Sequence, residues 1–128
     1  MARIMIVDDA LMMRKTLRRM LEKIDCEIVE EAASGEQALA KYAQCCPDLV
    51  TMDLTMPGMG GLEAIRQLKA QEPTANILVI SALGQKHAVF EALQLGAKNY
   101  IVKPINEEKL QSVVRLLLSE IPKEAAHG

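Results

Sequence analysis

The stretch Leu49-Val50-Thr51-Met52-Asp53-Leu54-Thr55-Met56-Pro57-Gly58 joins an apolar run to a turn, with Asp53 at the junction. Three other apolar runs of the chain end in the same way. They end at Asp8-Asp9, at Ser81 and at Lys103-Pro104. If these runs are parallel strands, their carboxyl ends lie along one edge of one sheet and their polar side chains converge there. The sequence therefore predicts a site made of three carboxylates, one hydroxyl and one ammonium group.

The composition is that of a single folded domain of 128 residues, half of them hydrophobic and a quarter charged. The formal net charge of −2 gives no reason to expect DNA as a partner. No signal peptide and no apolar stretch of about 18 residues is found, so we expect no membrane segment. The cysteine count is odd, at Cys26, Cys45 and Cys46. This count suits free thiols in a reducing cytoplasm better than a disulfide framework.

Strand and helix patterns alternate five times along the chain. Strands are expected over residues 3–8, 26–31, 48–53, 76–81 and 98–103. Helices are expected over residues 10–24, 34–45, 61–71, 84–95 and 106–119. This alternation predicts a parallel sheet with helices on both faces, and the more polar second strand belongs at an edge. We expect one domain over residues 1–121 and a short flexible tail over 122–128.

The three carboxylates lie close together if the first and third strands are neighbours, as they are in a sheet of order 2-1-3-4-5. Asp8 and Asp9 then face Asp53 across about 5 Å, the spacing of adjacent strands. Such carboxylates repel, so at least one pKa should be raised, and a magnesium ion would offset the repulsion. The alternative is an acidic cluster that faces solvent, with Asp9 as the N-cap of the first helix. Ser81 and Lys103 beside the cluster favour the metal site.

The chemistry that suits this site is phosphoryl transfer. An Asp carboxylate can attack phosphorus and form an acyl phosphate, and the transfer needs mainly positioning and charge neutralisation. Lys103 and magnesium could supply positive charge, and Ser81 could hydrogen-bond a phosphoryl oxygen. Phosphatases with a D-x-D motif need a second Asp two residues after the nucleophile, where this chain has Thr55. A stable phospho-aspartate is therefore favoured over rapid substrate turnover.

These residues resemble those of the receiver domains of two-component response regulators, over residues 2–120. The motifs that carry the resemblance are Asp8-Asp9, Asp53, Met56-Pro57-Gly58, Ser81-Ala82 and Lys103-Pro104. The resemblance implies a flavodoxin-like, doubly wound (βα)5 fold with a five-stranded parallel sheet. The order 2-1-3-4-5 is taken from this family and is not worked out from the residues.

The resemblance also implies roles for the acidic residues. Asp53 would accept a phosphoryl group from a histidine kinase. Asp9, Asp53 and the backbone carbonyl of Thr55 would hold Mg²⁺, with Asp8 acting mostly through water. The domain would then be a phosphoacceptor that assists its own phosphorylation and dephosphorylation, rather than an enzyme in the usual sense.

Three further residues receive roles from the same resemblance. Ser81 and Lys103 would bind the phosphoryl oxygens, and the Lys103-Pro104 peptide bond is a candidate for the cis form. Tyr100 stands where the family has its switch aromatic. Ser81 would move toward the phosphoryl group and Tyr100 would turn inward, which changes the face formed by the fourth helix, fifth strand and fifth helix.

Within the family, the segments around Asp53, Ser81 and Lys103 resemble stand-alone chemotaxis regulators of the CheY type. This implies a monomer with a CheA-like kinase, a flagellar switch or other protein as its target, and a phosphatase as a further partner. Three alternatives remain: an intermediate of another phosphorelay, a receiver cut from a longer regulator, and a protein-binding module that does not depend on phosphorylation.

Two other features have mainly structural interpretations. The first helix carries five basic residues that we interpret as a solvated face, with docking to an acidic protein as the alternative; they are Arg14, Lys15, Arg18, Arg19 and Lys23. The pair Gly60-Gly61 should loosen the start of the third helix, and the sequence gives it no functional role.

Overall fold

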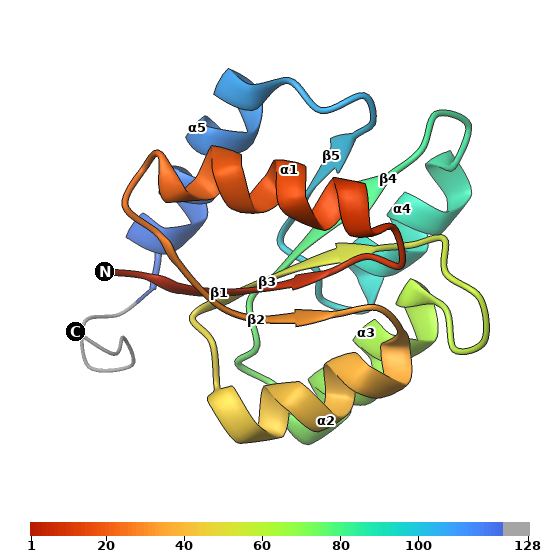
Figure 1. Cartoon of the computed structure of the whole chain (residues 1–128). Helices are drawn as coiled ribbons and strands as arrows, with labels where there is room; N and C mark the ends of the chain where they lie inside the picture. Colours follow the sequence, from red (N-terminus) through yellow and green to blue (C-terminus); the bar gives the residue numbers. More distant parts are fainter. Residues whose placement is uncertain (122–128) are drawn as a thin grey trace.

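The computed structural model describes residues 1–121, and it confirms the five alternating strands and helices (Figure 1). The strands are β1 (Arg3–Val7), β2 (Glu27–Ala32), β3 (Leu49–Asp53), β4 (Ile77–Ser81) and β5 (Asn99–Val102). The helices are α1 (Leu11–Glu22), α2 (Gly35–Cys45), α3 (Gly61–Gln71), α4 (Lys86–Gln94) and α5 (Glu107–Ser119). The expected tail, 122–128, lies outside the described residues.

All neighbouring strands are parallel, and the sheet has the order β2-β1-β3-β4-β5, as expected. The more polar strand β2 lies at an edge, which confirms its predicted place. Helices α1 and α5 cover one face of the sheet, and α2, α3 and α4 cover the other (Figure 1). Because strand order reverses between β1 and β3, the chain leaves a crevice at their carboxyl ends.

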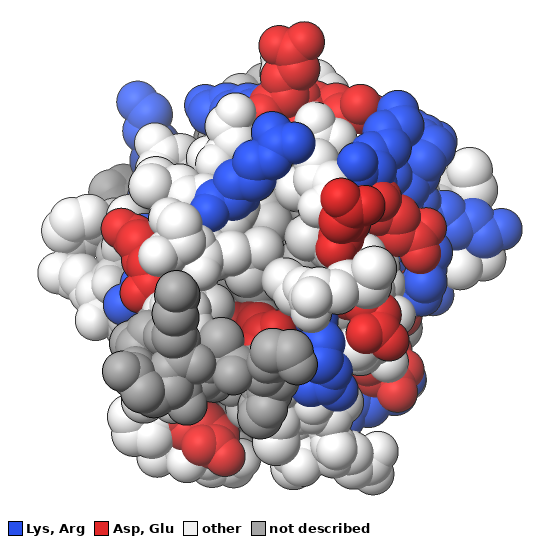
Figure 2. Space-filling view, turned by 90° about the vertical axis from the view of Figure 1, so that its left-hand side faces the viewer, with Lys and Arg blue, Asp and Glu red and all other residues white. Residues whose placement is uncertain are grey.

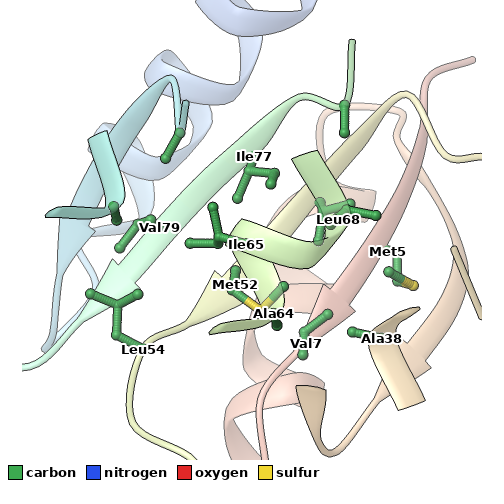
Figure 3. Packing of buried hydrophobic residues seen from close by; sticks show 14 of the residues in the cluster. Met5, Val7, Ala38, Met52, Leu54, Ala64, Ile65, Leu68, Ile77 and Val79 are labelled. Carbon is green, nitrogen blue, oxygen red and sulfur yellow. The ribbon is translucent and has the colours of Figure 1, made fainter. Parts of the chain in front are cut away.

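The core consists of two layers of apolar side chains, one on each face of the sheet. On one face, Ile65 and Leu68 of α3 pack over residues of the central strands, among them Met52 and Ile77 (Figure 3). On the other face, α1 and α5 pack over the strand residues of opposite parity, such as Ile4. Each fully buried aliphatic side chain stabilises the fold by roughly 1.5–3 kcal/mol, so these layers hold the strand ends in place.

Two helix starts carry a side-chain cap. The Ser34 hydroxyl accepts a hydrogen bond from the N–H of Gln37, and the side chain of Asn106 accepts one from the N–H of Lys109. Each bond satisfies one N–H that a helix leaves unpaired in its first turn. No helix within residues 1–121 has both the length and the apolar character needed to cross a membrane.

Two helix starts differ from the sequence-based prediction. The N-cap of α1 is Ala10 and not Asp9, so the alternative role of Asp9 as a helix cap is wrong. Helix α4 begins at Lys86 instead of residue 84, because Gly84 has a φ of +86° that is incompatible with a right-handed helix. The segment between β4 and α4 is therefore a true loop beside the strand ends.

Candidate functional site

Polar residues from four strands meet at the carboxyl edge of the sheet. Asp8 follows β1, Asp53 ends β3, Ser81 ends β4 and Lys103 follows β5 closely. The parallel register, which pairs Asp53 with Ile80, brings these ends to one edge. Asp8, Asp53 and Ser81 are each at most 2% exposed. Charged and polar groups are rarely this buried unless something pairs with them.

The three carboxylates form the cluster that the sequence predicts. Asp8, Asp9 and Asp53 each offer one oxygen, and these oxygens lie within 4.8 Å of one another. Burial raises the pKa of Asp53, and the negative charge of Asp8 raises it further. The N–H of Thr55 donates to Asp53 Oδ1 at 3.2 Å, and this hydrogen bond offsets part of the rise. Oxygen ligands of this number fit Mg²⁺, which usually binds through a few carboxylates and keeps several waters.

Lys103 provides the positive charge nearest to the buried carboxylates. Its Nζ lies 3.3 Å from Asp8 Oδ2 and 3.6 Å from Asp53 Oδ1. Its backbone N–H donates to the carbonyl of Ser81 at 2.7 Å, and the Lys103-Pro104 peptide bond is cis, as expected. One ammonium group cannot neutralise three carboxylates, so the cluster keeps an excess of negative charge.

The hydroxyl of Ser81 is buried and has no hydrogen-bond partner among residues 1–121. An unpaired buried hydroxyl costs free energy, so such a group in a native protein calls for an explanation, such as a role in catalysis or in binding a ligand. Thr51 Oγ1 is also buried without a partner in the described part of the chain, but Thr51 lies two residues before the end of β3. Of these two residues, Ser81 is the one that lies at the strand ends.

Sequence reasoning missed a bridge across the mouth of the site. The side-chain amide of Gln85 donates to Thr55 Oγ1 at 2.6 Å, and its oxygen accepts the N–H of Ala82 at 2.7 Å. The bridge joins the loop after β3 to the loop after β4. Gln85 and Thr55 are 30 residues apart, so no local pattern in the sequence could have revealed this contact.

Gly61 has a packing role that the sequence did not indicate. A Cβ atom at Gly61 would lie 2.2 Å from the carbonyl oxygen of Asp53 and 2.7 Å from the Cα of Leu54. Helix α3 therefore starts against the backbone that carries Asp53. The Gly60-Gly61 pair was the available signal, but its interpretation as a loose helix start was wrong for Gly61, which requires close packing.

Tyr100 lies on β5 and is 42% exposed. It lines a groove of about 360 Å³ that also contains Ser81 and Phe90. The groove thus extends from the strand ends to the surface of α4 and β5. Lys23, which we placed on a solvated face, pairs with Glu107 of α5, and Arg14 and Arg18 pair with Glu31 of β2.

Comparisons with known proteins agree with this geometry. Residues 4–115 match the family model of the response regulator receiver domain. The chain is 44% identical over 117 residues to the chemotaxis protein CheY of Bacillus subtilis, covering 91% of this chain and 98% of that protein. It is 42% identical to a protein-glutamate methylesterase/protein-glutamine glutaminase of Carboxydothermus hydrogenoformans, but covers 33% of that protein and 95% of this chain.

A solved structure gives the same result in three dimensions. The crystal structure of the CheX-CheY-BeF3-Mg²⁺ complex from Borrelia burgdorferi matches with a TM-score of 0.86 and 32% identity, covering 94% of this chain and 90% of that chain. The fold, the strand-end residues and these likenesses lead to one conclusion. The chain belongs to the family of response regulator receiver domains.

Proposed function

We propose that this receiver domain is a phospho-accepting switch in which Asp53 takes a phosphoryl group from a histidine kinase in the presence of Mg²⁺. The observation that carries the proposal is the state of the groups around Asp53. A buried carboxylate of raised pKa has an ammonium group 3.6 Å away and an unpaired hydroxyl on the adjacent strand. These groups suit a ligand with several oxygen acceptors, and a phosphoryl group supplies them.

In the transfer, an oxygen of the Asp53 carboxylate attacks the phosphorus of a phosphohistidine. The P–N bond breaks, its electron pair remains on the imidazole nitrogen, and that nitrogen then takes a proton. Lys103 and Ser81 donate to the phosphoryl oxygens, which stabilises charge as it develops. A Mg²⁺ ion held by Asp8, Asp9, Asp53 and the backbone carbonyl of Thr55 would neutralise charge on both the carboxylates and the phosphoryl group.

The phosphoryl group would change the output face through Ser81 and Tyr100. Because both residues line one groove, a shift of Ser81 toward the phosphoryl group makes room for the Tyr100 ring to turn inward. The exposed side chains of Phe90 and Tyr100 suit a protein partner on the face of α4, β5 and α5. Tyr100→Ala should keep phosphorylation and weaken target binding, and unchanged affinity of the phosphorylated variant would contradict this role.

The partners follow from the likeness to CheY proteins. We infer a CheA-like kinase, a target in flagellar motor control and a phosphatase, of which the CheX seen with the Borrelia protein is one kind of candidate. The match to one third of a methylesterase supports a second candidate function: similar receivers also occur within longer regulators. In that case the α4, β5 and α5 face would contact a second domain and not a separate protein.

Intact-mass measurement tests the proposal. The protein is incubated with acetyl phosphate or phosphoramidate, with Mg²⁺ or with a chelator, and wild type is compared with Asp53→Asn. We expect one added phosphoryl group in the wild type with Mg²⁺ and none in the variant. Absence of the added mass with both donors, or an equal gain in the variant, would contradict the proposal and favour a phosphorylation-independent binding module.

A further inference from the structure

Arg14 of α1 connects the acidic cluster to strand β2. Its Nη1 donates to the backbone carbonyl of Asp8 at 2.7 Å, and its Nε donates to Glu31 Oε1 at 2.9 Å. The Arg14 side chain is only 15% exposed, which contradicts its predicted place on a solvated face. The planar guanidinium presents several donors in fixed directions, so one side chain can hold two partners on different elements at once.

The contact with Asp8 acts on the peptide unit from which the next carboxylate extends. The carbonyl of Asp8 and the N–H of Asp9 belong to one planar peptide, so a bond to this carbonyl restricts the orientation of the whole unit. Three other bonds hold Asp8: its N–H donates to the carbonyl of Ala32 at 3.0 Å, its Oδ1 accepts the N–H of Ala10 at 2.9 Å, and its Oδ2 accepts a bond from Lys103 Nζ at 3.3 Å. Among the hydrogen bonds of residues 1–121, the bond from Arg14 acts on the Asp8–Asp9 peptide.

Electrostatics alone would make Arg14 unfavourable for a metal site. A guanidinium beside three carboxylates repels a divalent cation, and its removal should strengthen cation binding. A positional role has the opposite sign, because a loosened turn spreads the ligands that must converge on the ion. The two effects can therefore be told apart by the direction in which cation affinity changes.

We propose that Arg14 is a positioning residue for the cation: it orients the Asp8–Asp9 peptide so that both carboxylates converge with Asp53. The inference rests on the proposed function, since it assumes that this cluster holds Mg²⁺. Groups that orient metal ligands without touching the metal commonly change its affinity by about 10–100-fold when they are removed. The anchor for Arg14 is Glu31, a residue of the edge strand.

The chain offers a matched control in Arg18, one turn further along α1. Arg18 binds the same carboxylate of Glu31, at 2.7 Å from its Nη2 and 2.9 Å from its Nε. No hydrogen bond joins it to Asp8 among the described residues. Arg18→Met thus removes an ion pair and a positive charge from the same helix and leaves the Asp8–Asp9 peptide held by Arg14.

The test compares Mg²⁺ affinity in wild type, Arg14→Met, Arg14→Lys and Arg18→Met by calorimetric titration. We expect the Kd for Mg²⁺ to rise roughly tenfold in Arg14→Met and to stay within about twofold of wild type in Arg18→Met. The Kd should also be raised in Arg14→Lys, because lysine keeps the charge but lacks the several fixed donors of the guanidinium. A Kd that is unchanged or lower in Arg14→Met would overturn the proposal. An equal rise in Arg14→Met and Arg18→Met would also overturn it.

A second measurement separates this proposal from the proposed function. Amide hydrogen exchange at Ala10, whose N–H donates to Asp8, reports the order of the turn in the metal-free protein. Faster exchange at Ala10 in Arg14→Met than in Arg18→Met supports the positioning role, and equal exchange overturns it. If wild type binds no Mg²⁺, the proposed function fails, and this exchange result alone decides the role of Arg14. If Arg14→Met does not fold, Arg14→Lys is judged by the same criteria.

Discussion

The strands begin at one side of the sheet, here called the amino edge, and end at the opposite side, the carboxyl edge. The polar groups at these two edges differ in whether they are paired. At the amino edge, Asp48 accepts the N–H of Arg3 at 2.8 Å, donates its own N–H to the Arg3 carbonyl at 2.7 Å, and offers its carbonyl to Asn76 at 3.2 Å. At the carboxyl edge, Asp53 faces two other carboxylates and Ser81 has no partner within residues 1–121. The amino edge satisfies its own groups, whereas the carboxyl edge leaves groups available to a ligand.

Cavity size would point to the wrong edge. A cavity of about 500 Å³ lies at the amino edge, lined by Tyr42, Asp48 and Lys98 among others, and it is larger than the groove of about 360 Å³ beside Ser81. The surface seen from the amino edge carries acidic and basic side chains side by side (Figure 2). Unsatisfied buried groups, and not volume, therefore distinguish the edge that holds the candidate site.

The largest expected effect concerns the backbone of the carboxyl edge. Gly61→Ala should destabilise the protein by about 3 kcal/mol, because its Cβ would overlap the Asp53 carbonyl oxygen. Gly60→Ala is the matched control: its φ is −74° and the nearest atom to its Cβ would be 3.7 Å away, so the change should be neutral or slightly stabilising. Urea unfolding measures both, and equal losses would contradict the close packing of α3 on Asp53.

The second effect tests whether the amino edge is structural. Asp48→Ala removes the acceptor of the Arg3 N–H and should lower the free energy of unfolding by about 1–2 kcal/mol. The Mg²⁺ affinity of the folded variant should equal that of wild type, since Asp48 lies at the opposite edge of the sheet. Thermal unfolding and a Mg²⁺ titration give the two values. A large loss of Mg²⁺ affinity in Asp48→Ala would contradict the claim that the amino edge has only a structural role.

The third expected effect is smaller, and it is a gain in stability instead of a loss. Because the folded pKa of Asp53 is raised above the unfolded value of about 3.9, the folded state binds this proton more tightly. The metal-free wild type therefore loses stability as the pH rises from the unfolded pKa through the folded one, and the loss is complete above it. Asp53→Asn lacks this loss, so it should be more stable than the metal-free wild type at pH 7.

Two measurements check the source of this gain. Melting temperatures of Asp53→Asn and wild type should converge as the pH falls below about 4, where Asp53 is protonated in both states of the wild type. Saturating Mg²⁺ should stabilise the wild type and reduce or reverse the difference at pH 7, because an ion that binds only the folded state adds to its stability. If the wild type is more stable than Asp53→Asn at pH 7 without metal, the idea that the charged Asp53 carboxylate destabilises the folded state is contradicted.

Much of the site was predictable because its residues stand at the ends of apolar runs. The positions of Asp8, Asp53, Ser81 and Lys103 follow from strand ends that the sequence marks clearly, once the strands are parallel. The strand order came from the family resemblance, since no local pattern contains it. The sequence left the role of Asp9 open between helix cap and metal ligand, and the N-cap at Ala10 removes the first option.

The remainder depends on contacts between distant parts of the chain. Arg14 looked like one of several solvated basic residues, because its partner Glu31 lies on another element, 17 residues away. The bridge from Gln85 to Thr55 spans 30 residues and needs the loop that Gly84 creates. Side-chain forks and close backbone contacts are set by tertiary geometry, so their partners cannot be identified from spacing alone.

A Mg²⁺ titration of three proteins tests the central difference between the edges most directly. The three proteins are wild type, Asp53→Asn and Asp48→Asn. Asp53→Asn removes one carboxylate at the carboxyl edge, and Asp48→Asn removes one at the amino edge. The account predicts one Mg²⁺ per wild-type chain, affinity that is weakened at least about tenfold in Asp53→Asn, and affinity that is unchanged in Asp48→Asn. No saturable binding by the wild type, or an equal loss in both variants, would contradict it.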